Sequence, residues 1–204
     1  MIAIVDYGLG NIRAFSNMYK RMNIETQVVT RSGELRSATR IILPGVGAFD
    51  HAMELLQASG MRETLDELVL VRKVPVLGIC VGMQILAEGS DEGRLPGLGW
   101  ISGRVRAFKS VPQSAGLPLP HMGWNDVRPI AGVRLFDGLE ADARFYFLHS
   151  YFFECAQADC SAATANYGID FACAVRSDNV HGVQFHPEKS HQCGAQLLKN
   201  FAEL

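Results

Sequence analysis

Residues 74–84 have the sequence VPVLGICVGMQ, and this segment indicates the type of fold. Its first part, Val74 to Ile79, is a short apolar run rich in branched side chains, which predicts a buried strand. The following residues, Val81 to Glu88, include several good helix formers and predict a helix. Cys80 therefore lies at a sharp turn between a strand and a helix, with a glycine two residues away on either side.

This turn favours a nucleophilic role for Cys80. In hydrolases with a G-x-S-x-G motif, the same geometry lifts the catalytic serine out of the sheet. Here it would place the thiol at a helix N-terminus, which favours a thiolate, and aim the backbone N–H of Val81 at a developing oxyanion. Glycines at positions 78 and 82 let backbone and substrate approach closely. The alternative is that Cys80 is a small buried hydrophobic residue, as many lone cysteines are.

The composition is that of a globular α/β protein. The chain has 204 residues, of which 48% are hydrophobic and 20% charged, so residues 1–204 can form a single domain with a sizeable core. A formal net charge of −2 gives no electrostatic reason to expect nucleic-acid binding. The longest apolar runs are shorter than a membrane span, and no signal-peptide pattern precedes the first strand. The expected location is the cytoplasm.

The cysteines do not form a recognisable pattern. There are five, at positions 80, 155, 160, 173 and 193, an odd number without CxxC spacing. This argues against both a disulfide framework and a zinc site. We expect neither a metal nor a cofactor.

The chain around the central stretch alternates between strands and helices. The expected strands before it are Ile2–Val5, Thr26–Thr30 and Ile41–Leu43. A helix with apolar residues at Ile12, Phe15, Tyr19 and Met22 separates the first two strands, and helical sequence over 50–71 follows the third. Shorter strands are expected after it at Gly103–Phe108, Met122–Val127, Arg144–Glu154, Ala162–Tyr167, Phe171–Val175 and Val180–Phe185, with a closing helix at Gly194–Leu204. This order predicts a mostly parallel sheet flanked by helices, with ligands at the carboxyl ends of the strands.

The loop DYGLGN at 6–11 has two glycines in the spacing of a dinucleotide-binding motif. It lacks the third glycine, and no acidic residue follows a second strand in the expected way. We interpret it as a tight turn that can contact a ligand or a partner.

A second chemical motif, GVQFHPE (182–188), includes the end of the last predicted strand. Pro187 keeps His186 out of the helical conformation, so the backbone stays extended. Side chains two residues apart then point to the same side, and Glu188 can orient the imidazole of His186. A cysteine at a strand–helix turn, with a histidine backed by a carboxylate, is the arrangement of nucleophile, base and orienting group used in acyl transfer. Taken alone, the histidine would more often be structural.

These motifs identify a resemblance. GICVGMQ (78–84), HPE (186–188) and LPGVG (43–47) are similar to the triad, or class I, glutamine amidotransferases. More narrowly, DYGLGN (6–11), PHMGWN (120–125), HSY (149–151) and HPEKS (186–190) resemble the glutaminase subunits of imidazole glycerol phosphate synthase. The resemblance extends over essentially the whole chain. It implies a flavodoxin-like fold with an additional smaller antiparallel sheet.

The resemblance also implies a role for each matching residue. Cys80 would attack the carboxamide of L-glutamine, His186 would transfer the proton to the leaving ammonia, and Glu188 would hold His186. The oxyanion would be met by backbone N–H groups of Val81, Val46 and Gly47. The glutamine-binding residues would be Gly45, Gln84, Ser150 and Tyr151. From the residues alone, Gln84 could equally be a helix surface residue, and Ser150 and Tyr151 ordinary strand residues.

The partner implied by the resemblance is a (β/α)₈ cyclase subunit. It would receive the ammonia through a channel and make imidazole glycerol phosphate and AICAR in histidine biosynthesis. The matching interface positions are Asn11, Met122, Trp124, Asn125 and Lys189. An exposed tryptophan beside a glycine suits an interface anchor, although Trp124 could equally be a core residue.

Two stretches depart from this narrower resemblance. NIRAFSNMYKR (11–21) and HQCGAQLLKNF (191–201) are similar to a paralogous group that supplies ammonia for acetamidino sugars of surface polysaccharides. Three further alternatives are the glutaminase of pyridoxal phosphate synthase, a non-catalytic binding module on the same fold, and a stand-alone hydrolase of small amides. The PHMGWN and HPEKS stretches argue against the first, and the intact Cys80, His186 and Glu188 argue against the second.

Overall fold

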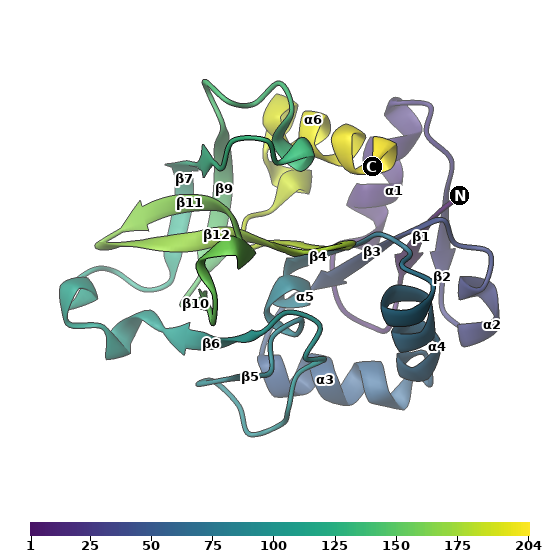
Figure 1. Ribbon diagram of the computed structural model, residues 1–204, viewed down its shortest axis with the longest axis horizontal. Helices are drawn as coiled ribbons and strands as arrows, with labels where there is room; N and C mark the ends of the chain where they lie inside the picture. Colours follow the sequence, from purple (N-terminus) through teal and green to yellow (C-terminus); the bar gives the residue numbers. More distant parts are fainter.

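A mixed eleven-stranded sheet forms the centre of the computed structural model, which describes all residues 1–204 (Figure 1). Five strands pair in parallel in the order β2 (Thr26–Val29), β1 (Ile2–Val5), β3 (Arg40–Gly45), β4 (Val76–Cys80) and β13 (Val180–Val183). The sheet continues through antiparallel strands β12 (Ile169–Ser177), β10 (Tyr151–Cys155), β6 (Gly103–Ala107), β11 (Ser161–Tyr167) and β8 (Arg128–Pro129), and β5 (Gly89–Ser90) pairs in parallel with β6.

The parallel half of the sheet positions the candidate site. All residues of β1 and β4 are buried, as expected for parallel strands covered on both faces. The register pairs Gly45 with Cys80 and Val183 with Ile79, so β3, β4 and β13 end together at one edge. Residues that follow these three strands therefore meet at the carboxyl edge, where ligands bind in sheets of this kind.

Helices cover both faces of the sheet, as the alternating sequence predicted (Figure 1). On one face lie α3 (Phe49–Ala58) and α4 (Arg62–Asp66), which runs on into a π-helical turn at Glu67–Val71, and on the other lie α1 (Ile12–Arg21) and α6 (His191–Glu203). The short helix α2 (Ser32–Leu35) follows the edge strand β2. In α1, the predicted apolar stripe buries Phe15 and Tyr19, and the Tyr19 hydroxyl donates to the carbonyl of Leu198 in α6 at 3.1 Å.

A separate two-stranded ribbon confirms the additional antiparallel sheet. Strand β7 (His121–Asp126) pairs with β9 (Arg144–His149) from His121 opposite His149 to Asp126 opposite Arg144. Because side chains alternate across a strand, the ribbon has two different faces. Buried side chains lie on its inner face, and exposed apolar side chains lie on its outer face.

The helix after Cys80 is shorter than the sequence predicted. Helix α5 covers only Val81–Gln84, rather than continuing to Glu88. The carbonyls of Ile85, Leu86, Ala87 and Glu88 instead accept hydrogen bonds from backbone N–H groups between positions 97 and 101. The N–H of Glu88 donates to the carbonyl of Gly103 instead of that of Gln84, so hydrogen bonds to the segment 97–103 replace the last predicted helical turn.

The predicted strand Arg144–Glu154 is two strands that belong to different sheets. The break falls at Ser150, between β9 in the ribbon and β10 in the central sheet. Continuous β-propensity does not reveal this division, because it depends on which neighbours each half pairs with. The break brings Ser150 and Tyr151 to the carboxyl edge of the parallel strands.

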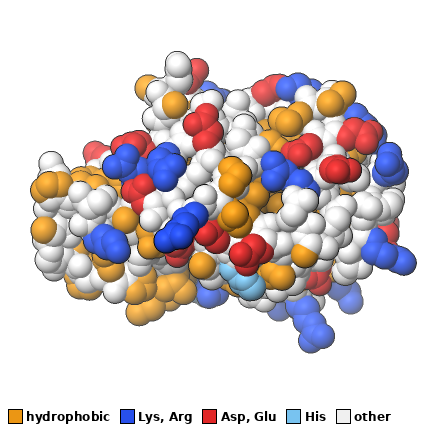
Figure 2. Space-filling model, turned by 90° about the horizontal axis from the view of Figure 1, so that it is seen from below, with side chains coloured by type: hydrophobic (Ala, Val, Ile, Leu, Met, Phe, Trp, Pro, Cys, Tyr) orange, Lys and Arg blue, Asp and Glu red, His pale blue; other side chains and the backbone are white.

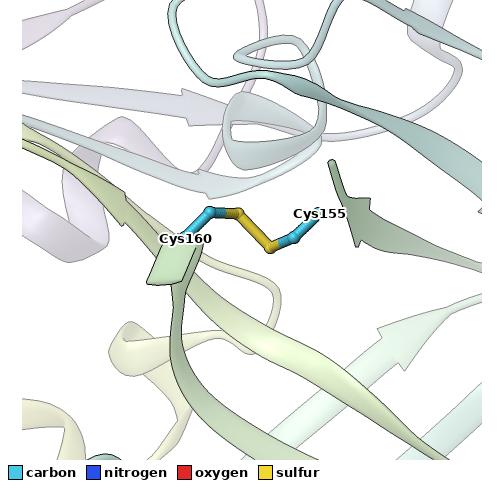
Figure 3. Close-up of a disulfide and its surroundings, with 2 residues drawn as sticks. All are labelled: Cys155 and Cys160. Carbon is cyan, nitrogen blue, oxygen red and sulfur yellow. A yellow bond between two sulfur atoms is a disulfide. The ribbon is translucent and has the colours of Figure 1, made fainter. Parts of the chain in front are cut away.

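The expectation against disulfides is wrong for one pair of cysteines. Cys155, at the end of β10, is bonded to Cys160, just before β11, with a Cα–Cα distance of 5.9 Å (Figure 3). A 3₁₀ turn at Ala158–Cys160 reverses the chain and brings the two thiols together. The other three cysteines are free. The number and spacing of the cysteines could not predict this bond, because the two thiols come close only through the turn between them.

The surface carries charges of both signs. On the face seen in Figure 2, acidic and basic side chains are interspersed, which fits the small net charge. None of the helices is long and apolar enough to cross a membrane. Beneath the surface, the buried apolar side chains form one contiguous cluster of 60 residues that includes Cys80 and extends from β1 to α6.

Candidate active site

Cys80 lies at the turn between β4 and α5 with an unusual backbone conformation. Its φ is +56°, a left-handed value that L-residues rarely adopt and that is found at strained functional turns. The flanking glycines make the turn fit. A Cβ at Gly82 would lie 1.9 Å from the carbonyl oxygen of Leu43, and one at Gly78 would lie 2.5 Å from the carbonyl oxygen of Gly82. No side chain could replace either hydrogen without moving backbone.

His186 and Glu188 align as the His-Pro-Glu spacing predicted. The Nδ1–H of His186 donates to Oε1 of Glu188 at 2.9 Å, and both side chains are almost completely buried. The backbone of His186 is held as well: its N–H donates to the carbonyl of Tyr146, and its carbonyl accepts from the hydroxyl of Ser190. With Nδ1 occupied by the carboxylate, Nε2 remains for proton transfer.

The electrostatics of this pair favour the imidazolium. Burial alone lowers the pKa of His186, but hydrogen bonding to Cys80 and Glu188 and the negative charges of both groups outweigh it and raise that pKa well above its usual value. A protonated His186 beside Cys80 stabilises a thiolate. The positive charge of His186 contributes more to this stabilisation than the helix dipole, because α5 has only four residues.

A pocket of about 300 Å³ opens above Cys80. It brings together residues from the ends of β3, β4 and β9, from the start of β10, and from the His-Pro-Glu segment. Its lining comprises Val46, Gly47, Cys80, Val81, Gln84, Glu92, Pro120, Leu148, His149, Ser150, Tyr151, His186 and Lys189. Glu188 lies behind His186, outside this lining, and Gly45 lies buried in β3 directly before it.

The loop after β3 packs against the turn at Cys80. A Cβ at Gly45 would lie 2.4 Å from the backbone nitrogen of Gly82, so the two segments touch through their backbones. Gly47 has a φ of +89°, which favours glycine. The DYGLGN loop supports this segment from behind, because the buried Tyr7 hydroxyl donates to the carbonyl of Pro44 at 2.8 Å. That contact gives the loop a packing role instead of nucleotide binding.

Gln84 is not a surface residue of a helix. Only 3% of it is exposed, and its Nε2–H donates to Oε1 of Gln184 at 3.0 Å. Gln184 is completely buried and its Nε2 lies 3.9 Å from the Cys80 sulfur. The sequence analysis missed Gln184, although its spacing of two and four residues from His186 and Glu188 was a signal that it shares their side of the strand.

Glu92 is a second residue that the sequence analysis missed. It lines the pocket together with Tyr151, and its Oε2 accepts a hydrogen bond from the backbone N–H of Phe49 at 2.9 Å. A carboxylate fixed in this way can attract a cationic group of a ligand. No motif marked it, because it lies in a glycine-rich loop that only the fold brings to the pocket.

The proposed interface positions do not all point the same way. Met122 and Trp124 lie on the outer face of the ribbon, where they are 65% and 41% exposed, so Trp124 is not a core residue. Trp124 stacks on His191, and the Lys189 ammonium lies over the ring of Tyr146. Asn11 is exposed at the start of α1, whereas Asn125 points to the inner face of the ribbon, where it contacts His121 and Asn166.

Comparison with known proteins gives a consistent result. The model of the family "Glutamine amidotransferase class-I" matches residues 3–204. The chain is 65% identical over the full length of both proteins to the "Imidazole glycerol phosphate synthase subunit HisH" of Bdellovibrio bacteriovorus, and 44% identical, again over both full lengths, to "Imidazole glycerol phosphate synthase subunit HisH 2" of Pseudomonas aeruginosa. A solved structure described as a glutamine amidotransferase superposes with a TM-score of 0.77 at 21% identity, covering 99% of this chain and 97% of that chain, which shows the same fold.

Proposed function

This chain belongs to the class-I glutamine amidotransferase family, and on that premise we propose that it is the glutaminase subunit of an imidazole glycerol phosphate synthase. It would hydrolyse L-glutamine to L-glutamate and ammonia, and a cyclase subunit would consume the ammonia. The observation that carries the proposal is that Cys80 and His186 line one pocket while Glu188 holds His186 from behind, in a chain 65% identical to a relative of that name.

The first half of the reaction is the attack on the amide. The Cys80 thiolate adds to the side-chain carbonyl carbon of glutamine, and the backbone N–H groups of Val81 and of the 46–47 segment receive the oxyanion. His186 then donates its Nε2 proton to the leaving nitrogen, and the C–N bond breaks to release ammonia. Glu188 keeps the imidazolium oriented and stabilised throughout. A γ-glutamyl thioester remains on Cys80.

The second half regenerates the enzyme. A water molecule transfers a proton to the now neutral His186 and attacks the thioester carbon, the C–S bond breaks, and glutamate leaves. Glu92 is suited to receive the α-ammonium group of the substrate, and the backbone of Ser150 and Tyr151 its amino-acid end. Gln84 and Gln184 line the buried side of the site and can hold the carboxamide and the sulfur in register.

The partner would be a (β/α)₈ cyclase subunit that docks on the outer face of the ribbon. Met122, Trp124 and Leu148 form an exposed apolar surface there, and Leu148 and Lys189 also line the pocket. Tryptophan and methionine at a partly exposed patch are typical of interface centres. Ammonia released at Cys80 would then leave toward the partner rather than into bulk water.

The test is glutamate release from glutamine, with and without a histidine-pathway cyclase subunit and its ribonucleotide ligand. Cys80→Ala serves as the blank, and its fold is checked by circular dichroism. Strong stimulation by the cyclase supports the proposal, and Trp124→Ala should weaken this stimulation while basal turnover stays unchanged. Cys80-dependent turnover that no cyclase stimulates would refute the histidine-pathway assignment but leave glutaminase chemistry standing.

One observation favours a second candidate. Residues 11–21 and 191–201 resemble a paralogous group that supplies ammonia for acetamidino sugars of surface polysaccharides. The acceptor of the ammonia would then be an amidotransferase that makes such sugars. This enzyme is therefore the next partner to test in the same assay.

A further inference from the structure

The inner face of the β7–β9 ribbon holds two buried histidines that the mechanism above does not use. Nδ1 of His121 lies 2.9 Å from Nε2 of His149. At one end of this pair, Nε2 of His121 lies 3.2 Å from Nδ2 of Asn125. At the other end, Nδ1 of His149 lies 2.7 Å from the backbone carbonyl oxygen of Tyr151. Four groups from two strands and the start of β10 thus form one continuous chain of hydrogen bonds.

The direction of this chain is fixed from the Tyr151 end. A carbonyl oxygen can only accept, so Nδ1 of His149 must carry a proton and donate it. If His149 is neutral, its Nε2 is then an acceptor. His121 must therefore donate to it from its own Nδ1, which leaves Nε2 of His121 as an acceptor.

The Asn125 end gives the same direction independently. Oδ1 of Asn125 accepts from the backbone N–H of Asp126 at 2.8 Å, and its Nδ2 donates to the carbonyl of Asn166 at 2.8 Å. Rotating the amide by 180° would place oxygen against oxygen and N–H against N–H, so its orientation is settled. The NH₂ group therefore faces His121 and donates to Nε2. Both ends require neutral imidazoles with the proton on Nδ1.

The surroundings keep the two imidazoles neutral and immobile. The His121 ring is stacked between Phe147 and Tyr167, with centroid distances of 4.9 and 4.1 Å, and both histidines are only 5% exposed. Burial lowers the pKa of His121 to about 4 and that of His149 to about 3. An imidazolium at either position would place two N–H donors against each other. The low pKa values mean that this form is absent near neutral pH.

The chain ends at the substrate pocket. Tyr151 and Ser150 line it beside Cys80, and the carbonyl of Ser150 also accepts from the backbone N–H of Phe108 at 3.1 Å. We propose that Asn125, His121 and His149 form a directional hydrogen-bond relay that holds the Ser150–Tyr151 backbone where it receives the amino-acid end of glutamine. This inference rests on the proposed function for its substrate. It makes His121 and His149 positioning residues, since neither relays a proton to the reacting atoms.

The tautomers provide a test that needs no activity. Nitrogen-15 NMR of the imidazoles should show both His121 and His149 neutral and protonated at Nδ1 between pH 6 and 8, although free histidine prefers the Nε2 proton. Assignment comes from the spectra of His121→Phe and His149→Phe. An Nε2 proton on either ring, or an imidazolium in this range, overturns the relay.

A substitution tests the positioning role. His121→Phe keeps a flat ring between Phe147 and Tyr167 but removes both nitrogens, so His149 loses its donor. We expect the KM for glutamine to rise about tenfold, the size expected for one buried acceptor left without its partner, while kcat changes little. Alkylation of Cys80 by iodoacetamide, which has no amino-acid end, should proceed at the wild-type rate. Exchange of the Phe108 amide hydrogen should become faster.

The matched control is His181→Phe. His181 is another largely buried histidine whose pKa burial lowers, but it lies on β13 outside the relay. It should leave the KM for glutamine and the Phe108 exchange rate unchanged. A KM for His121→Phe within twofold of wild type overturns the positioning role. So does a rise in KM that is matched by equal decreases in kcat and in the rate of Cys80 alkylation. Absence of glutamine hydrolysis in the wild type, even with the cyclase, would instead refute the proposed function, and the tautomer and exchange readouts would still decide the relay.

Discussion

The contact between Gly82 and Leu43 allows a sharp test of how Cys80 is held. Gly82 is in α5 and does not have a positive φ, so alanine can adopt its backbone conformation. The added methyl would nevertheless lie 1.9 Å from the carbonyl oxygen of Leu43, and 3.0 to 3.1 Å from two further backbone atoms of β3. Because Cβ atoms do not approach other atoms closer than 3.0 Å, the two backbones must separate by more than 1 Å.

This separation has two calculable effects. Overpacking against backbone that cannot rotate away costs about 3 kcal/mol, at the upper end for added core methyl groups. For a chain of this size, the same cost lowers the melting temperature by roughly 6–12 °C. A displacement of 1 Å at the nucleophile turn should also reduce kcat for glutamine hydrolysis by about 100-fold.

Urea unfolding and steady-state glutaminase kinetics measure the two effects. The control is Gly33→Ala in α2, where a Cβ meets nothing within 4 Å and should stabilise the protein by up to about 1 kcal/mol. If Gly82→Ala loses less than about 1 kcal/mol and keeps wild-type kcat, the close approach of β3 and α5 does not position Cys80.

Three further predictions concern charge, pH and covalent structure. Glu188→Gln should lower kcat by about 10²-fold or more with little change in KM, because the imidazolium loses its counter-charge while the pocket lining is unaltered; equal kcat values would exclude the assigned role. Burial lowers the pKa of His149 from 6.5 to about 3, so between these pH values only the unfolded chain binds a proton at this residue. The contribution of neutral His149 to stability is therefore complete above pH 6.5 and falls by about 2 kcal/mol between pH 7.5 and 5. His149→Phe should remove this loss from urea titrations at the two pH values. Dithiothreitol should lower the free energy of unfolding by about 2 kcal/mol, the loop-closure value for the short Cys155–Cys160 loop, and should have no effect on Cys155→Ser.

Local patterns were sufficient to predict the centre of the fold. The apolar run before Cys80 and the His-Pro-Glu spacing each depend on a few consecutive residues, and the structure brings the two segments together at one sheet edge. The parallel strands were found because their side chains are buried on both faces and leave a continuous apolar signal. The narrower resemblance also extended over the whole chain, and full-length relatives carry that name.

Most of the features that sequence reasoning missed depend on contacts between residues that are distant in the sequence. The helix after Cys80 stops early because hydrogen bonds between residues 85–88 and the segment 97–103 replace its last predicted turn. The long strand from Arg144 divides because its halves pair with different neighbours. Glu92 reaches the pocket from a loop without a motif, and the bond between Cys155 and Cys160 follows from a tight turn. The first three features depend on residues far away in the sequence, whereas the disulfide depends on a local turn that the spacing of the cysteines does not reveal.

Because side chains alternate between the two faces of β7, a change in the length of this strand affects both faces at the same time. Deleting Gly123 would leave His121 in place, turn Trp124 toward the interior and turn Asn125 toward solvent, because side-chain direction changes with every residue. The exposed apolar surface and the buried polar chain would be lost in the same event. Descendants of this protein can therefore exchange side chains on either face one at a time, but an insertion or deletion within these six positions would change both faces at once.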